Sequence, residues 1–200
     1  MATRGGPVAS GTDGSDYGHR ERVANQYRIS AQSKSRLKAC LFFHILLFFL
    51  MLAKLSADIF DRLDIFILEI EELEIPKCFL LLQPLVWEYA WCCSLPFVFY
   101  GLSSLRRNVI RSMSVFVMGD IVFALLPVFF SLGYYMGDFW QYVSSRSSDG
   151  LMLWQGYPYA LLWYAFSLVA LQIHCFSLYF AHTLISAWRA RGGAGTKKIN

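Results

Sequence analysis

A run of uncharged residues near the C-terminus constrains this chain more than any other feature. The segment Tyr159–His182 is 24 residues long and contains no Lys, Arg, Asp or Glu. A helix needs about 20 apolar residues to cross the hydrocarbon core of a bilayer, which is about 30 Å thick. Tyr157, Tyr159 and Trp188 lie near its ends, where amphipathic rings favour the membrane interface. We therefore predict a membrane-spanning helix over 159–182.

The composition of the whole chain also indicates a membrane protein. Of the 200 residues, 16% are charged and 56% are apolar, whereas soluble domains average about 25% charged and about 45–50% apolar. The cysteines have no spacing typical of a metal site, and no nucleotide-binding, HExxH or GxSxG pattern occurs. We therefore expect no cofactor, no metal and no nucleic acid partner.

Three further apolar stretches predict three more spans, so the expected fold is an all-α bundle of four transmembrane helices. These stretches cover about 39–57, 85–105 and 112–135. Pro96 is expected to kink the second of them, because proline removes a hydrogen bond from a helix interior.

The placement of Lys and Arg predicts the orientation. The three segments that together hold 14 of these residues are 1–38, 106–111 and 189–200. The two intervening loops, 58–77 and 137–156, hold three. Because cytosolic segments of membrane proteins are enriched in Lys and Arg, we expect both termini in the cytosol and both loops in the lumen.

The same pattern predicts three parts of the chain. A basic arm covers 1–38, and its glycine-containing start is expected to be disordered. A four-span domain covers 39–188, and a basic tail covers 189–200. Within the domain, the acidic segment 58–77 is interpreted as a short amphipathic element, and 137–156 as a polar loop.

Both termini carry candidate targeting signals. Lys197 and Lys198 stand fourth and third from the C-terminus and resemble the KKxx signal that a COPI-type coat complex reads in the cytosol. A flexible glycine linker over 192–195 is expected to present them. Arg20 and Arg22 have two interpretations: part of a basic arm that contacts anionic lipid, or an arginine-based retention signal.

Two ionisable side chains are predicted deep in the bilayer. By the helical rise of about 1.5 Å per residue, Asp120 lies about 13 Å beyond Arg111, and His174 lies about 12 Å before His182. A charge at this depth costs about 2.5–3.5 kcal/mol on insertion scales. A hydrogen-bonded Asp120–His174 pair relieves this cost and fixes helix register. A catalytic or proton-relay pair is the second interpretation, and in a third the two never meet.

Other ionisable residues are expected nearer the interface. Lys54 ends the first span, where its stem can snorkel and where Asp58, four residues on, is the expected partner. A functional lysine is the alternative interpretation. Glu88 falls in the first turn of the second span. His44 lies within the first span and receives no role.

Several short stretches point to one family. The most specific are Gly11–Tyr17 and His19–Ala24 in the arm. The others are Leu52–Ser56, Trp87–Tyr89, Gly101–Ser103, Gln172–His174 and Leu178–Phe180. Together they resemble the Jagunal family of endoplasmic reticulum (ER) membrane proteins over nearly the whole chain. The resemblance implies four spans, residence in the ER, a role in organising that membrane and supporting vesicle traffic, and coat contact through the basic tail. It carries over no catalytic residues.

Functions from different classes remain open at this point. The favoured one is a non-enzymatic ER membrane protein that organises the ER, supports vesicle-mediated transport and secretion, and is retrieved through Lys197 and Lys198. Its expected partners are the bilayer and the coat, and a homo-oligomer is compatible with it. The alternative is an intramembrane lipid- or sterol-modifying enzyme that uses Asp120, His174 and Glu88 as acid and base groups. An ion or solute path is a third hypothesis and needs oligomers.

Overall fold

The protein is mostly helical, which confirms the predicted fold class in that respect. The computed structural model describes residues 17–62, 85–146, 150–151, 153–154 and 157–196. Its elements in chain order are α1 (Tyr17–Arg62), α2 (Val86–Cys92), α3 (Leu95–Arg107), α4 (Ile110–Gly119), the π-helical turn η1 (Asp120–Leu125), α5 (Leu126–Tyr134), α6 (Met136–Ser145), β1 (Leu153–Trp154), β2 (Tyr157–Pro158) and α7 (Tyr159–Thr196). The two short strands pair as an antiparallel hairpin.

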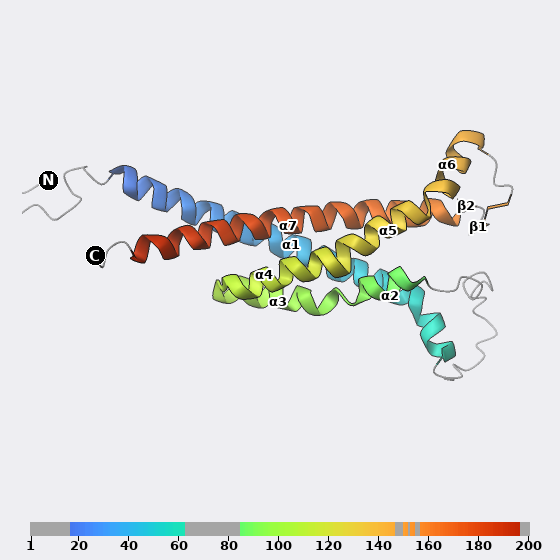
Figure 1. Ribbon diagram of the computed structural model, residues 1–200, viewed down its shortest axis with the longest axis horizontal. Coiled ribbons are helices and arrows are strands. Elements are labelled where there is room, and N and C mark those ends of the chain that lie inside the picture. Colours follow the sequence, from blue (N-terminus) through green and yellow to red (C-terminus); the bar gives the residue numbers. More distant parts are fainter. Residues whose placement is uncertain (1–16, 63–84, 147–149, 152, 155–156, 197–200) are drawn as a thin grey trace, which may run out of the picture.

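Apart from α6, the helical elements form four rods along a common long axis (Figure 1). α1 forms the first rod and α7 the fourth. α2 and α3 follow one another in the second rod, and α4, η1 and α5 make up the third. α1 and α7 pack against each other and run in opposite directions. The beginning of α1 and the end of α7 therefore lie at the same end of the bundle.

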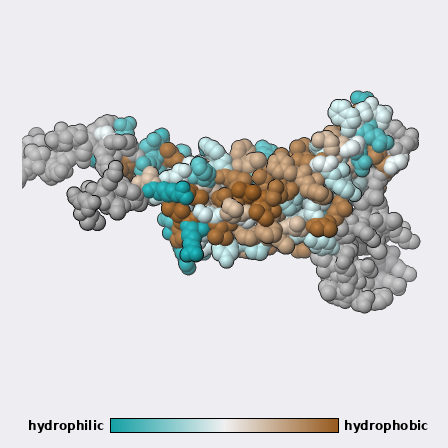
Figure 2. Space-filling view, viewed as in Figure 1, coloured by the Kyte–Doolittle hydropathy of each residue, from teal (hydrophilic) through white to brown (hydrophobic). Residues whose placement is uncertain are grey.

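Three helical segments are long and apolar enough to cross a membrane. They are Val23–Ser56, Ile110–Tyr134 and Tyr159–Ala190, and they overlap three of the four predicted spans. α1 begins well before the predicted span, so the described part of the basic arm is helical. Figure 2 shows apolar surface around the middle of the bundle and hydrophilic side chains towards its ends. Phe42 and Phe49 are more than half exposed on α1, as expected for side chains that face lipid.

The remaining predicted span, 85–105, is divided into two short helices. α2 has seven residues and α3 has 13, with Pro96 in the first turn of α3. Proline lacks an N–H and cannot continue the hydrogen-bond ladder of a preceding helix. The sequence predicts a kink at this proline, whereas the structure has a full break over Cys93 and Ser94.

Two segments predicted as loop or linker are helical instead. Most of the first half of the loop 137–156 belongs to α6, where Asp138 lies in the first turn and favours the positive end of the helix dipole. The glycine linker 192–195 lies within α7. Extending an existing helix fixes one residue for each added hydrogen bond, so a long helix can continue through glycines that would not start one. Residues 1–16 and 63–84, which include most of the acidic segment, lie outside the described part.

The apolar core divides into two clusters along the bundle axis. The first lies towards the beginnings of α2 and α7 and includes Met51, Trp91 and Trp163. The second lies towards the ends of the chain and includes Leu37 and Phe116. Lipid tails are as apolar as these side chains, so apolar contact alone does not determine how helices pair in a membrane. The polar side chains between the two clusters therefore bear directly on helix register.

Candidate functional site

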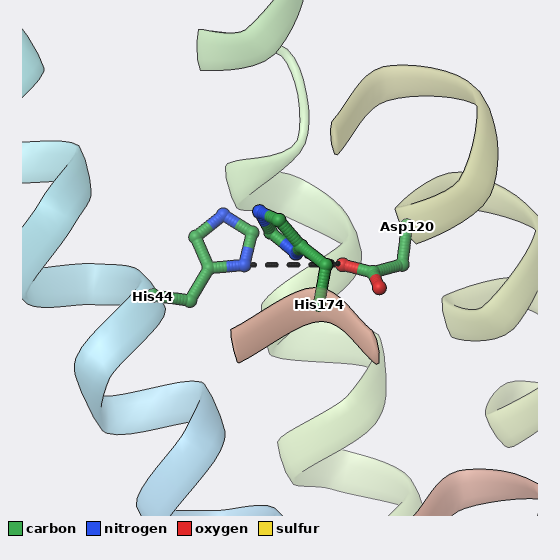
Figure 3. A group of neighbouring side chains, drawn as sticks. All are labelled: His44, Asp120 and His174. Carbon is green, nitrogen blue, oxygen red and sulfur yellow. Dashed lines mark hydrogen bonds and ion pairs between the residues drawn. The ribbon is translucent and has the colours of Figure 1, made fainter. Parts of the chain in front are cut away.

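A layer of buried polar side chains crosses the middle of the bundle between the two apolar clusters. Each rod contributes one residue to this polar layer: His44 from α1, Ser94 from the break between α2 and α3, Asp120 from η1 and His174 from α7. Each of the four is at most 1% exposed. Figure 3 shows His44, Asp120 and His174 meeting from three different helices.

Asp120 and His174, which the sequence places at similar depth, are in contact. His174 Nδ1 lies 2.9 Å from Asp120 Oδ1. On the other side of the ring, Trp91 Nε1 lies 3.3 Å from His174 Nε2. An indole N–H only donates, so Nε2 accepts and the ring proton lies on Nδ1. His174 therefore donates to the carboxylate, and these contacts link α2, η1 and α7.

His44 is a member of the layer that sequence reasoning missed. Its Nε2 lies 2.8 Å from Ser94 Oγ, and its ring stacks on Trp91 with centroids 5.3 Å apart. Its Nδ1 lies 3.9 Å from Asp120 Oδ1, which is beyond hydrogen-bond distance. The helical rise offered a signal, because it places His44 about 9 Å beyond Lys38 and so well inside the bilayer.

Two buried atoms of the layer lack a hydrogen-bond partner within the described residues. They are His44 Nδ1 and Asp120 Oδ2. Buried polar atoms in folded proteins are nearly always satisfied, so each exception calls for an explanation. The layer therefore has spare capacity to bind a proton or a cation.

A π-helical turn presents Asp120 to this layer. In η1, the N–H of Leu126 donates to the carbonyl of Ile121, five residues back. Pro127 follows directly, and its missing N–H removes a regular α-helical bond at this point. π turns inside α-helices are frequent at functional sites. Here the turn begins at the residue whose carboxylate enters the layer.

A second polar site lies between α1, α2 and α7, nearer the beginning of α2. Lys54 Nζ donates to Glu88 Oε2 and lies 5.4 Å from the centroid of the Trp163 ring. The side chain of Glu88 is 1% exposed and that of Lys54 is 13% exposed. Lys54 is thus partly buried, and it pairs with a residue of another rod. The side chain of Asp58, the predicted partner, lies outside the described part of the chain.

Comparison with known proteins agrees on one family. Residues 1–192 match the family described as "Jagunal, ER re-organisation during oogenesis". The chain belongs to the Jagunal family. Protein jagunal of Drosophila melanogaster is 51% identical over 196 residues, which are 96% of each chain. The protein jagunal homolog of Caenorhabditis elegans is 32% identical over 200 residues, which cover 94% of this chain and 97% of the relative. Protein jagunal homolog 1 of Homo sapiens is 28% identical over 189 residues, which are 94% of each chain.

The family match confirms the resemblance drawn from the short stretches, but the candidate targeting signals stay predictions. Arg20 lies on the exposed surface of α1. Arg22 lies in the same helix, with its side chain outside the described part. Lys197 and Lys198 directly follow α7 and lie outside the described part of the chain.

The polar layer of this Jagunal protein has some features of a catalytic site. In space, Ser94 lies next to His44 and His44 lies next to Asp120. This is the order of nucleophile, base and orienting carboxylate in a catalytic triad. However, the 3.9 Å separation interrupts this order, and Asp120 Oδ1 already accepts from His174. A cavity of about 500 Å³ between α1 and α7 is lined by side chains outside the layer. The Jagunal family is described by ER re-organisation and not by a reaction.

Proposed function

We propose that this Jagunal protein is a non-enzymatic, multi-pass ER membrane protein that organises the ER and supports vesicle-mediated transport in the early secretory pathway. The match of residues 1–192 to a family described by ER re-organisation carries the proposal. The apolar surface on the face of the bundle seen in Figure 2 supports it, because large exposed apolar surfaces mark contact with membranes or partners. The lipid bilayer is then a partner along the whole bundle, and a homo-oligomer remains compatible with this role.

Four crossings with cytosolic termini fit the arrangement of the rods. α2 and α3 have seven and 13 residues, together about 30 Å of helix at about 1.5 Å per residue, which is close to the thickness of the bilayer core. An even number of crossings returns the chain to its starting side, and the described ends of α1 and α7 lie together (Figure 1). Arg106 and Arg107 are exposed in the last turn of α3. Their positive charge supports a cytosolic position for this end.

Retrieval by a COPI-type coat through Lys197 and Lys198 is the second part of the proposal. α7 continues to Thr196, directly before the two lysines. A helix that leaves the bilayer carries its end away from the surface by about 1.5 Å per residue. The helix itself, rather than a flexible linker, would then hold the signal clear of the membrane. Arg20 and Arg22 remain a separate candidate for retention.

The test compares the localisation of the full-length chain with that of Lys197→Ser/Lys198→Ser, with the tag at the N-terminus. The matched control is Arg189→Ser/Arg191→Ser, which removes the same charge from the same tail but leaves KKxx intact. We expect only the dilysine variant to reach the Golgi or the cell surface. Retention of both variants argues against a coat-read dilysine, and escape of both assigns retrieval to the charge of the tail.

A lipid- or sterol-modifying enzyme is a second candidate, because Asp120 and His174 lie in one layer with Ser94. Asp120→Leu/His174→Leu replaces both polar groups with apolar side chains. Normal localisation and folding combined with altered lipid or sterol composition of the ER would favour the enzyme. Loss of folding together with localisation would favour a structural pair.

A further inference from the structure

Three side chains of the polar layer have the donor types and the spacing of a metal site. His44, Asp120 and His174 each offer one ligand atom, and these atoms lie within 4.8 Å of one another. We propose that they bind one divalent transition-metal ion, Zn²⁺ or Fe²⁺, through two imidazoles and one carboxylate. The three residues come from three different helices (Figure 3), so the ion would tie three of the four rods together. This site goes beyond the ER-organising role proposed above.

The donor set selects the class of ion. Zn²⁺ binds histidine nitrogen and carboxylate oxygen at about 2.0–2.2 Å, and two histidines with one carboxylate are also typical of Fe²⁺ sites. Ca²⁺ and Mg²⁺ prefer oxygen ligands and, in the case of Mg²⁺, several waters. The layer supplies two nitrogens and is almost fully buried, which disfavours both of these ions.

The spacing of the ligand atoms is close to that of a bound site. With bonds of about 2.0 Å, ligands around a tetrahedral ion lie roughly 3.3 Å apart. Asp120 Oδ1 is 2.9 Å from His174 Nδ1 and 3.9 Å from His44 Nδ1. The first of these distances must widen and the second must shorten, each by about half an ångström. The ligand atoms of the two histidines lie within 4.8 Å of each other and must close by up to about 1.5 Å. An ion would then take the place of the proton between His174 and Asp120.

The unsatisfied atoms of the polar layer also support a metal site. His44 Nδ1 and Asp120 Oδ2 are buried without a hydrogen-bond partner in the described part of the chain. An ion bound by Nδ1 and Oδ1 would satisfy the first of these atoms and balance the negative charge of the carboxylate that carries the second. Ser94 completes the arrangement, since it lies 2.8 Å from His44 Nε2. When Nε2–H donates to this hydroxyl, the lone pair of Nδ1 is left for the ion. Histidines that bind metals almost always use their second nitrogen in this way.

Trp91 gives an expectation that is specific to metal binding. A neutral imidazole carries one proton, so His174 must move this proton from Nδ1 to Nε2 when Nδ1 binds the ion. The Nε2–H then faces the Trp91 N–H, which lies 3.3 Å away, and two donors cannot bond to each other. The indole N–H therefore opposes the ion, and its removal should strengthen metal binding.

The test measures metal in the full-length chain, purified from membranes in mild detergent with a tag that contains no histidine. Elemental mass spectrometry should find about one ion of Zn or Fe per chain, and their ratio identifies the ion. His44→Gln and Asp120→Asn should each reduce the content by at least about tenfold. The matched control is His182→Gln, because His182 is an exposed histidine on the same helix as His174. This variant should keep the ion.

Two further variants keep all three ligands, so they decide the question even where a ligand variant fails to fold. In competition with a chelator, Ser94→Ala should hold the ion about tenfold more weakly than the unchanged chain, and Trp91→Phe should hold it more tightly. A metal content below about a tenth of an ion per chain in the protein without substitutions overturns the proposal. Metal content that is unaffected by His44→Gln, or weaker binding in Trp91→Phe, overturns it as well.

Discussion

Two buried polar sites in the bundle differ in how fully their atoms are satisfied. Near the beginning of α2, Lys54 donates to Glu88 and its ammonium group also lies over the Trp163 ring. In the polar layer, His44 Nδ1 and Asp120 Oδ2 have no hydrogen-bond partner in the described part of the chain. The first site is a closed ion pair, whereas the second has capacity left over.

This difference separates a structural contact from a candidate binding site. A closed pair of opposite charges is costly to break, because the remaining charge is left buried. Removing a member of the polar layer breaks hydrogen bonds, which between helices in a membrane are worth about 0.6 kcal/mol on average, so the expected loss is smaller. Stability measurements should therefore rank the ion pair above the polar layer, and metal measurements should respond to the layer alone.

The largest expected effect comes from opening the ion pair. Glu88→Leu leaves the ammonium of Lys54 without its carboxylate, and breaking a buried pair in this way typically costs about 3–5 kcal/mol. The free energy of unfolding, measured in a detergent titration, should fall by this order. Lys54→Met/Glu88→Leu removes both charges and should recover most of the loss. A double variant that is no more stable than Glu88→Leu would contradict this account of the pair.

The next effect comes from overpacking beside Asp120. A Cβ added at Gly119 would lie 2.1 Å from the Phe97 ring, so in Gly119→Ala either this ring or α4 must shift. Overpacking in a well-packed core costs about 1–3 kcal/mol. The matched control is Gly133→Ala in α5, where an added Cβ meets nothing within 4 Å. Equal stability of the two variants would show that the close approach at Gly119 does not restrain the third rod.

A smaller effect is expected for the hydrogen bond within the polar layer. Single and double substitutions of Asp120 and His174 with leucine form a double-mutant cycle. Hydrogen bonds between helices in a membrane average about 0.6 kcal/mol and reach about 1.7 kcal/mol. The carboxylate acceptor places this pair towards the upper value, well below the ion pair. A coupling free energy near zero would mean that the two side chains meet without stabilising each other.

The sequence predicted which side chains lie at the same level of the bundle better than it predicted which helices are neighbours. Helical rise converts residue spacing into depth, so Asp120 and His174 were expected at one level, and they are in contact. Spacing does not show which way a side chain points around its helix or which rods are adjacent. Sequence spacing offered only Asp58 as a partner for Lys54, and the side chain of Asp58 lies outside the described part of the chain. It missed Glu88, 34 residues away on another rod, which the structure pairs with Lys54. The same limit explains why His44 received no role.

The interruption of the second rod was predicted in place but not in kind, and the π turn in the third rod was not predicted. Pro96 marks the interruption of the second rod, yet it does not reveal that α2 and α3 are separate helices. Pro127 lacks the N–H of a regular helical hydrogen bond in the third rod. Either a regular kink or a π turn can accommodate the missing bond. Local sequence alone does not decide between them.

The smallest expected effect comes from an ordinary hydrogen bond outside both sites. Ser131 of α5 and Ser167 of α7 are buried, and their hydroxyl oxygens lie 2.8 Å apart. Ser131→Ala leaves one hydroxyl unpaired, while Ser131→Ala/Ser167→Ala removes both, so the cycle isolates the bond. We expect a coupling of about 0.6 kcal/mol and an unchanged metal content. This bond sets the baseline for a neutral contact between two rods. If its coupling equalled that of Asp120 with His174, the charge in the polar layer would add nothing to stability, and its retention there would rest on binding alone.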